Sequence, residues 1–188
     1  MSWAPDSLGL PLVVKPTRGG SALGLTIVRS AAQLPFAMVT AYAYGDVAMI
    51  EQLVEGVEVA VSIVEDDHGE AQTLPAVEIV PDGGVYSYEA RYTAGATEFF
   101  TPARLSSSAA ASASAASLTA YRTLGHQHLS RVDLIIDANE RPWFLEANVS
   151  PGMTETSLLP MSVEAAGLDA VEVYAGIVAR ALTTHPAT

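Results

Sequence analysis

The sequence contains no cysteine, and Lys15 is its single lysine. The absence of cysteine excludes a disulfide framework and thiolate metal sites. No apolar run is long enough to span a bilayer, and the opening segment MSWAPDSLGLPL lacks the basic and apolar regions of a signal peptide. We therefore expect a cytoplasmic protein without a membrane partner.

Positive charge is also scarce, because nine basic residues face 21 acidic ones and the net charge is −12. Such a chain has no basic stripe, which argues against nucleic acid as a partner. Hydrophobic residues make up 49% of the 188 residues. This amount is enough to bury the core of one domain or of two small ones.

A glycine-rich segment follows the first strand-like run. The run LPLVVK ends at Lys15, and TRGGSALG comes directly after Pro16. A loop of this kind can cover phosphates with its backbone N–H groups while a lysine supplies a point charge. The segment lacks the Gly-Lys-Ser/Thr of a Walker loop. Taken alone it favours an ordinary turn between two strands.

The remaining pattern mixes strands with helices. Strands are expected at 25–28, in two runs between 47 and 67, and at 74–80. A helix is expected to start at Ser30 or at Pro35 and to run to Tyr44. Further helices are expected over the alanine-rich segment 106–125 and in two closing segments between 157 and 182. The pattern predicts an α+β fold.

The most informative stretch is RVDLIIDANERPWFLEANVSPGMTETS, residues 131–157. Two alternating runs predict a hairpin that closes about Asn139 and Glu140. Asp133 then lies across from Glu146 and Arg131 across from Asn148. On the simple alternation, Phe144, Glu146 and Asn148 share one face of the second strand.

Two opposed carboxylates repel each other in a bare sheet. A bound Mg²⁺ would make this arrangement favourable, because Mg²⁺ takes carboxylates, amide oxygens, phosphates and waters as ligands. The small-residue turn SPGMT follows at the end of these carboxylates and allows backbone N–H groups to approach an anion. The alternative is a solvated polar face on an edge hairpin.

Two further features have both a functional and a structural interpretation. Glu51 and Glu58 flank a bend at Gly56, where they are either solvated or accept hydrogen bonds from the amine and hydroxyls of a nucleotide. The segment VYSYEARYTAGATEFF, which contains Arg91 and Tyr92, is either a binding loop or a loop packed by its tyrosines.

Taken in order, these motifs resemble the D-alanine–D-alanine ligases of the ATP-grasp superfamily. The resemblance runs from about residue 10 to the end, and EANVSPGMT within the hairpin is its most specific part. It implies a partial ATP-grasp fold with antiparallel sheets flanked by helices. Residues 1–57 would form part of the central subdomain and residues 58–188 the C-terminal subdomain.

The resemblance also implies roles in binding ATP and Mg²⁺ or Mn²⁺. Lys15 and Arg91 would contact the phosphates and Glu58 the ribose. Glu51 and the backbone near Val54 would contact the adenine. The implied magnesium ligands are Asp133, Glu146 and Asn148.

The remaining implied roles concern the reacting groups. Ser21 and Tyr92 resemble the pair that orients the first D-alanine. Arg131 and the Gly152 N–H resemble the groups that stabilise the oxyanion. Ser157 and the Leu158 backbone resemble the site for the second D-alanine's carboxylate.

The implied reaction forms an acyl phosphate from one D-alanine and ATP, and a second D-alanine then displaces phosphate. Such a ligase serves peptidoglycan biosynthesis, cell wall biogenesis and cell shape, and its full-length form allows a homodimer. An N-terminal domain of the family has no counterpart in this sequence. We therefore expect the chain alone to have little or no ligase activity.

Departures from the family pattern keep alternatives open. Arg91 stands where a lysine is common, and Ala22 where the loop often has a second serine. A D-Ala–D-Ser or D-Ala–D-lactate ligase is one alternative, and a non-catalytic nucleotide- or magnesium-binding remnant is another. A glycosidase using Asp133 and Glu146 as its acid pair is disfavoured by their cross-strand contact.

Overall fold

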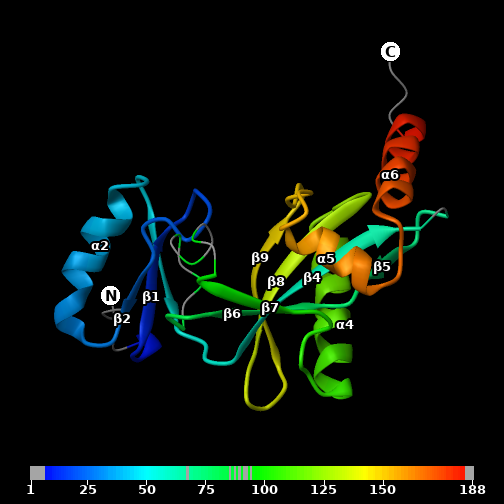
Figure 1. Ribbon diagram of the computed structural model, residues 1–188. Coiled ribbons are helices and arrows are strands. Elements are labelled where there is room, and N and C mark those ends of the chain that lie inside the picture. The colour runs from blue at the N-terminus through cyan, green and yellow to red at the C-terminus, as the bar shows by residue number, and fades with distance from the viewer. Residues whose placement is uncertain are drawn as a thin grey trace. The chain divides into compact units, whose positions relative to one another are not determined.

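The computed structural model describes residues 7–66, 68–84, 86, 88, 90, 93 and 95–184, without the side chains of 183 and 184 (Figure 1). The chain divides into two compact units. The first contains Met1–Val54 and Val80–Glu98, and the second contains Glu55–Ile79 and Phe99–Thr188. The subdomain boundary expected between residues 57 and 58 stays a prediction.

The first unit contains a three-stranded antiparallel sheet in the order β2-β1-β3. Its strands are β1 (Leu12–Pro16), β2 (Thr26–Val28) and β3 (Ala48–Gln52). Helix α2 (Leu34–Tyr42) packs on one face of this sheet and forms a small apolar core with it. The buried members of that core are Leu12, Val14, Val28, Leu34, Ala37 and Ala41.

The entry into α2 reflects two sequence signals. The 3-10 turn η1 (Ala31–Gln33) comes first, and the Gln33 side chain accepts a hydrogen bond from the Ser30 N–H at 3.0 Å. Pro35 then lies in the first turn of α2. Proline is well tolerated there because a first-turn N–H has no partner within the helix. Ser30 therefore starts the 3-10 turn, and the α-helix proper starts at Leu34.

The second unit is built on a six-stranded sheet in the order β7-β6-β4-β8-β9, with β5 also paired to β4. The strands are β4 (Val57–Glu65), β5 (Ala71–Thr73), β6 (Val77–Pro81), β7 (Thr97–Phe100), β8 (Leu129–Ile136) and β9 (Pro142–Asn148). Neighbouring β4, β8 and β9 are antiparallel. The three helices are α4 (Ser107–Thr123), α5 (Leu158–Ala165) and α6 (Ala170–Thr184).

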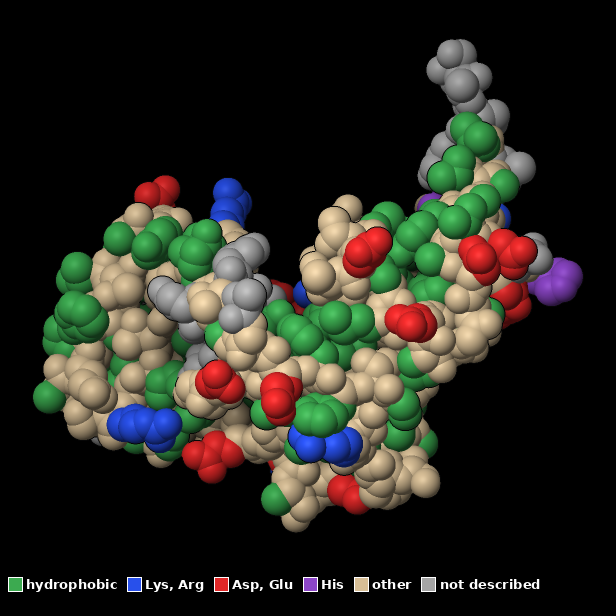
Figure 2. Space-filling view, in the orientation of Figure 1, with side chains coloured by type: hydrophobic (Ala, Val, Ile, Leu, Met, Phe, Trp, Pro, Cys, Tyr) green, Lys and Arg blue, Asp and Glu red, His purple; other side chains and the backbone are tan. Residues whose placement is uncertain are grey.

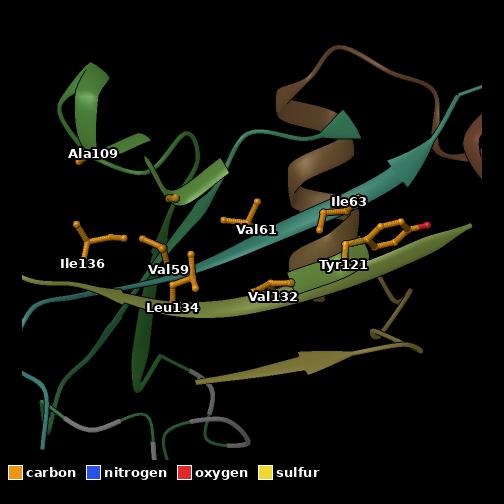
Figure 3. Packing of buried hydrophobic residues seen from close by; sticks show 9 residues of the cluster. Val59, Val61, Ile63, Ala109, Tyr121, Val132, Leu134 and Ile136 are labelled. Atoms are coloured by element: carbon orange, nitrogen blue, oxygen red, sulfur yellow. The ribbon is translucent and has the colours of Figure 1, made fainter. Parts of the chain in front are cut away.

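One face of this sheet is an apolar core (Figure 3). Alternate residues of β4 and β8 pack there against α4, as expected for strands covered on one side. The buried members are Val59, Val61, Ile63, Val132, Leu134 and Ile136 from the sheet, with Ala109, Ala113 and Tyr121 from the helix. Alanines at the contact let α4 approach the sheet closely.

Helix α4 forms from the alanine-rich segment as predicted. The Ser106 side chain caps it by accepting a hydrogen bond from the Ala109 N–H at 3.1 Å. Gly125 lies just after the helix with φ +68, a conformation that glycine adopts without strain. The low-complexity composition thus encodes a helix rather than a linker.

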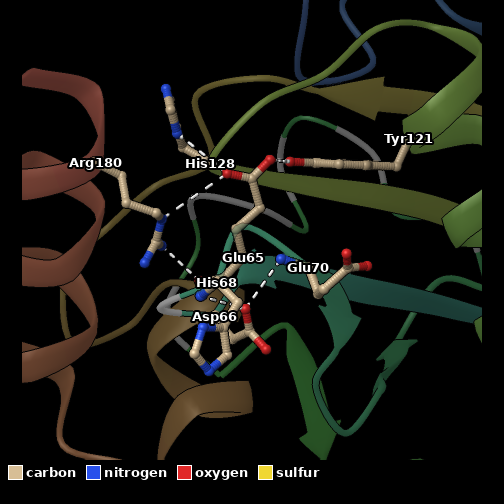
Figure 4. Close-up of polar contacts among 7 residues, drawn as sticks. All are labelled: Glu65, Asp66, His68, Glu70, Tyr121, His128 and Arg180. Carbon is tan, nitrogen blue, oxygen red and sulfur yellow. Dashed lines mark hydrogen bonds and ion pairs between the residues drawn. The ribbon is translucent and has the colours of Figure 1, made fainter. Parts of the chain in front are cut away.

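The far end of β4 anchors the C-terminal helix (Figure 4). The Glu65 carboxylate accepts a hydrogen bond from the Tyr121 hydroxyl at 2.8 Å and lies 3.2 Å from His128 Nδ1. Arg180 of α6 donates to the Glu65 carbonyl at 2.5 Å. Burial and the hydrogen bond to Glu65 raise the pKa of Tyr121, so that this hydroxyl keeps its proton and donates.

Strands β5 and β7 were not predicted, because they are short and, unlike the three-residue β2, they mix strongly polar with apolar residues. Apolar side chains cover the outer surface of α2 and run along α6 (Figure 2). They include the exposed residues Phe36, Val39, Tyr42, Val171, Val178 and Leu182. Among the described residues, no helix has the length and apolarity needed to cross a membrane.

Candidate active site

The predicted hairpin is present as β8 and β9. Asp133 pairs with Glu146 and Arg131 pairs with Asn148 in the strand register. The turn closes with a hydrogen bond from the Asp137 N–H to the Arg141 carbonyl at 3.1 Å, and Glu140 adopts φ +62. The pairing inferred from alternation is therefore confirmed.

The hairpin contains an irregularity that alternation did not reveal. The register shifts between Asp133 and Leu134, so that Leu134 opposes Phe144 and Leu145 is the extra residue. Such a bulge changes the face on which the following side chains lie. The prediction that Phe144 shares a face with Glu146 and Asn148 is wrong, because Phe144 pairs with a residue of the α4 face.

Several predicted site residues share the sheet face opposite α4. The register pairs Glu58 with Ile135, Ala60 with Asp133 and Ser62 with Arg131. Paired residues point to the same face, and their neighbours Val59, Val61 and Val132 belong to the α4 core. This polar face therefore contains Glu58, Arg131, Asp133, Glu146 and Asn148.

Arg131 and Asp133 bind each other on this face. The Arg131 Nε donates to Asp133 Oδ1 at 2.7 Å, and its terminal nitrogen donates to Oδ2 at 2.9 Å. The two side chains are only 10% and 5% exposed. Each carboxylate oxygen thus faces one nitrogen of a planar guanidinium, the strongest arrangement of an ion pair.

The loop after β9 places three further candidates beside one another. Asn148 Oδ1 accepts a hydrogen bond from the Ser150 N–H at 2.9 Å, which starts the turn. A Cβ on Gly152 would lie 2.6 Å from the Ser157 hydroxyl, so glycine is needed for this approach. Ser157 then precedes α5, whose first residue, Leu158, is buried.

Two candidates of the first unit, Lys15 and Glu51, lie on the sheet face opposite α2. Lys15 Nζ is 2.5 Å from the Glu51 carboxylate. Both alternate with the buried Leu12 and Val14 or their partners, so the register directs them away from the helix. The phosphate-binding candidate and the adenine-binding candidate are thus neighbours.

The glycine-rich loop between β1 and β2 is a chain of tight turns. Its N–H groups at Leu23 and Leu25 donate back to the carbonyls of Gly20 and Ala22 at 3.2 Å. Ser21 and Ala22 both have positive φ, 56 and 57. Val54, the remaining candidate of this unit, follows β3. Arg91 and Tyr92 lie outside the described residues.

Sequence reasoning missed Thr154. Its hydroxyl lies 2.8 Å from the Ser157 hydroxyl, and its carbonyl accepts the Ser157 N–H at 2.7 Å. The Ser157 side chain makes no cap hydrogen bond to its own helix. The three-residue spacing of two hydroxyls before a helix was the available signal.

The donor set of the polar face suits a hard divalent cation. Mg²⁺ is commonly held by one or two carboxylates together with phosphates and waters. Asp133, Glu146 and the amide of Asn148 match this requirement by oxygen chemistry and by register. No group of three or more His, Cys, Asp or Glu side chains able to hold a metal occurs among the described residues. Asp133, Glu146 and Asn148 offer three oxygen donors, which leaves the other positions of an octahedral Mg²⁺ to other ligands.

Comparison with known proteins matches residues 3–179 to the family described as D-ala D-ala ligase C-terminus. The D-alanine–D-alanine ligase of Bordetella petrii is 40% identical over 177 residues, which is 94% of this chain and 54% of that protein. The chain spans about half the length of the curated relatives it matches.

Solved structures agree with the fold. The VanG D-Ala:D-Ser ligase of Enterococcus faecalis superposes with a TM-score of 0.83 at 28% identity, over 94% of this chain and 51% of that one. The Bacillus anthracis D-alanine–D-alanine ligase complexed with ATP superposes with a TM-score of 0.74 at 28% identity, over 95% and 53%. The expected partial ATP-grasp fold is confirmed. By the match of nearly its whole length, this chain belongs to the D-alanine–D-alanine ligase C-terminus family.

Proposed function

We propose that the chain is the ATP- and metal-binding half of a ligase that joins two D-alanine molecules with hydrolysis of ATP to ADP and phosphate. The proposal is supported by the polar face of the β4–β8–β9 sheet. There the carboxylates of Asp133 and Glu146 and the amide of Asn148 lie in register beside Arg131. The names of the relatives, and the ATP complex of one of them, support the same assignment.

Asp133, Glu146 and Asn148 would hold Mg²⁺. The ion would supply positive charge to the phosphoryl oxygens and hold them in line for transfer. Glu58, which lies on the same face, would accept hydrogen bonds from the ribose hydroxyls.

The first unit would supply the phosphate and adenine contacts. Lys15 and Arg91 would donate to phosphate oxygens, and Glu51 with the Val54 backbone would pair with the adenine edge. The glycine-rich loop at Ser21 would offer backbone N–H groups to the phosphates. Such a cover would also keep water from the acyl phosphate.

The reacting groups would be oriented by fixed donors. Arg131 and the Gly152 N–H would stabilise the oxyanion formed when the second amine attacks the acyl phosphate. Ser21 and Tyr92 would orient the first D-alanine. The Ser157 hydroxyl and the Leu158 N–H would hold the carboxylate of the second, where the start of α5 favours negative charge.

Two measurements test the proposal. Calorimetry of the chain with ADP and Mg²⁺ should detect binding that Asp133→Asn weakens. The chain joined to the preceding half of the Bordetella petrii ligase should form D-alanyl-D-alanine, whereas the chain alone should show little or no turnover. Product formation by the chain alone would contradict the second expectation, and no product from the fusion would contradict the proposed reaction.

A second candidate differs only in the amine or hydroxyl substrate. It is favoured by the superposition on a D-Ala:D-Ser ligase. Phosphate release by the fusion with D-alanine, D-serine and D-lactate would separate these activities. A role in peptidoglycan synthesis, a cytoplasmic location and a homodimer are further parts of the proposal.

A further inference from the structure

The Arg131–Asp133 pair occupies the carboxylate on which the proposed metal site depends. Both Asp133 oxygens accept a hydrogen bond from the same guanidinium, at 2.7 and 2.9 Å. Both side chains are almost fully buried. A buried carboxylate needs a cation beside it, since an unpaired buried charge is strongly destabilising. Arg131 meets that need.

A divalent cation at Asp133 would compete with this arginine. Each carboxylate oxygen has a second lone pair, so a metal can approach, but it would then lie near a fixed positive charge in a poorly solvated place. Like charges that are close together repel more strongly where water is excluded. Glu146 lies directly across from Asp133 in the strand register and is exposed, so its carboxylate also attracts the metal.

We propose that Arg131 is a built-in counter-cation that neutralises Asp133 until a divalent metal replaces it, and that metal loading thereby releases the guanidinium towards the reacting acyl group. This inference rests on the proposed function. It adds that the metal and the oxyanion donor are energetically coupled through one carboxylate. Metal binding would then do two things: hold phosphate and free the donor for the second step.

The coupling predicts the direction in which stability and metal affinity change when Arg131 is replaced. Removing the guanidinium takes away the cation that contacts both Asp133 oxygens. The metal-free protein should lose stability, and its affinity for a divalent cation should rise. Coupling between two bound groups is commonly worth about 5- to 150-fold in affinity. By linkage, the metal should restore the stability that the substitution removes.

The chain offers a matched control in a second pair of the same unit. The Arg104 Nε and terminal nitrogen donate to the two Glu78 oxygens at 2.9 and 2.7 Å. The register pairs Glu78 with Val59, which places it on the α4 face. Breaking this pair should also destabilise the fold, but a metal should not repair the damage.

The experiment compares the chain with Arg131→Gln, Arg104→Gln and Asp133→Asn. Mn²⁺ binding is followed by the loss of the free-ion electron paramagnetic resonance signal, and the melting temperature is measured with EDTA and with Mn²⁺. We expect Arg131→Gln to bind Mn²⁺ at least about fivefold more tightly than the parent and to regain its melting temperature with Mn²⁺. Arg104→Gln should melt earlier in both conditions, and Asp133→Asn should bind weakly.

Each alternative outcome of this experiment would contradict a specific part of the proposal. If the parent binds Mn²⁺ and Arg131→Gln binds no more tightly, the coupling is refuted while the metal site stands. If neither protein binds Mn²⁺, the proposed metal site and the coupling are both refuted. If Arg131→Gln does not fold in EDTA, Arg131→Lys keeps the charge without the two-pronged contact. That variant should bind Mn²⁺ more tightly than the parent, because the metal no longer has to displace the two-pronged contact, and an affinity no higher than the parent's would refute the displacement of Arg131 by the metal.

Discussion

The two faces of the six-stranded sheet each contain one arginine–carboxylate pair with the same two-pronged geometry. On the α4 face, Glu78 is 8% exposed and its partner Arg104 is 56% exposed. On the polar face, Asp133 and Arg131 are 5% and 10% exposed. The first arginine comes from a loop and reaches in from solvent, where it also lies 3.5 Å from the Phe100 ring. The second stands on the same strand as its carboxylate.

Under the proposed function, the Arg131–Asp133 pair would belong to the active site, whereas the Arg104–Glu78 pair would only stabilise the fold. On β4, the cross-strand partner of Glu78 is Val59, an apolar residue. Asp133 has Glu146 as its cross-strand partner. The polar face thus combines a buried carboxylate with a second carboxylate directly across from it. Two ion pairs of the same geometry would therefore have different roles because the residues around them differ.

The largest loss of stability should come from a cavity in the apolar face of the sheet. Leu134→Ala removes a fully buried side chain that packs under α4, and should cost about 2–5 kcal/mol of unfolding free energy. Ile135→Ala on the polar face is the matched control, since Ile135 is only partly buried. Urea denaturation at constant pH measures both. Equal losses at the two positions would contradict the assignment of faces.

The next largest loss of stability should come from breaking the Arg104–Glu78 ion pair. Glu78→Gln should destabilise the chain by about 2 kcal/mol, because the arginine loses its charged partner but remains half exposed to water. Mn²⁺ should not change this loss. A metal-dependent recovery in this variant would mean that the two faces do not differ as described.

The contribution of Glu78 should depend on pH. Hydrogen bonds from the Arg104 guanidinium hold the pKa of the Glu78 carboxyl below its ordinary value of 4.5. A carboxyl with a depressed pKa contributes its full stability above its unfolded pKa and loses it as the pH falls through the folded one. The difference in unfolding free energy between the parent and Glu78→Gln should therefore be constant above pH 4.5 and shrink below it. A difference that grows on acidification would refute this cause.

The smallest effect on stability should come from the loop after β9. Gly152→Ala places a methyl group 2.6 Å from the Ser157 hydroxyl and 3.2 Å from its Cβ, so the hydroxyl must rotate away from Thr154 and the loop must shift slightly, at a cost of about 1 kcal/mol. In the fused ligase the same change should raise the KM for the second D-alanine while the KM for ATP stays unchanged. Unchanged kinetics would remove Ser157 and Gly152 from the proposed substrate site.

Much of the fold follows from local pattern. The hairpin register was predictable because alternation and a polar turn leave few ways to pair Asp133 with the second strand. The bulge at Leu145 was not, since one extra residue leaves the sequence pattern almost unchanged while it moves Phe144 to the other face. Helix α4 was predictable from alanine content and from Ser106 and Gly125 at its ends.

The candidate site was only partly predictable. Reasoning from the residues weighed the repulsion between Asp133 and Glu146 across strands, but not the attraction of Asp133 to Arg131 two residues earlier on the same face. Spacing does not give rotamers, and rotamers decide which of two neighbours a carboxylate contacts. The same reason hid the contact of Thr154 with Ser157.

The most direct test of the account is to measure turnover by the fused ligase that contains Asp133→Asn. The control is the fused ligase that contains Glu78→Gln, a substitution on the other face of the sheet. The account predicts that Asp133→Asn loses about 100-fold or more in turnover, as expected when a charge that holds the transferring group is removed. Glu78→Gln should keep turnover near the parent value at a temperature where both proteins are folded. Asp133→Asn with parental turnover would contradict the claim that the polar face is the catalytic one.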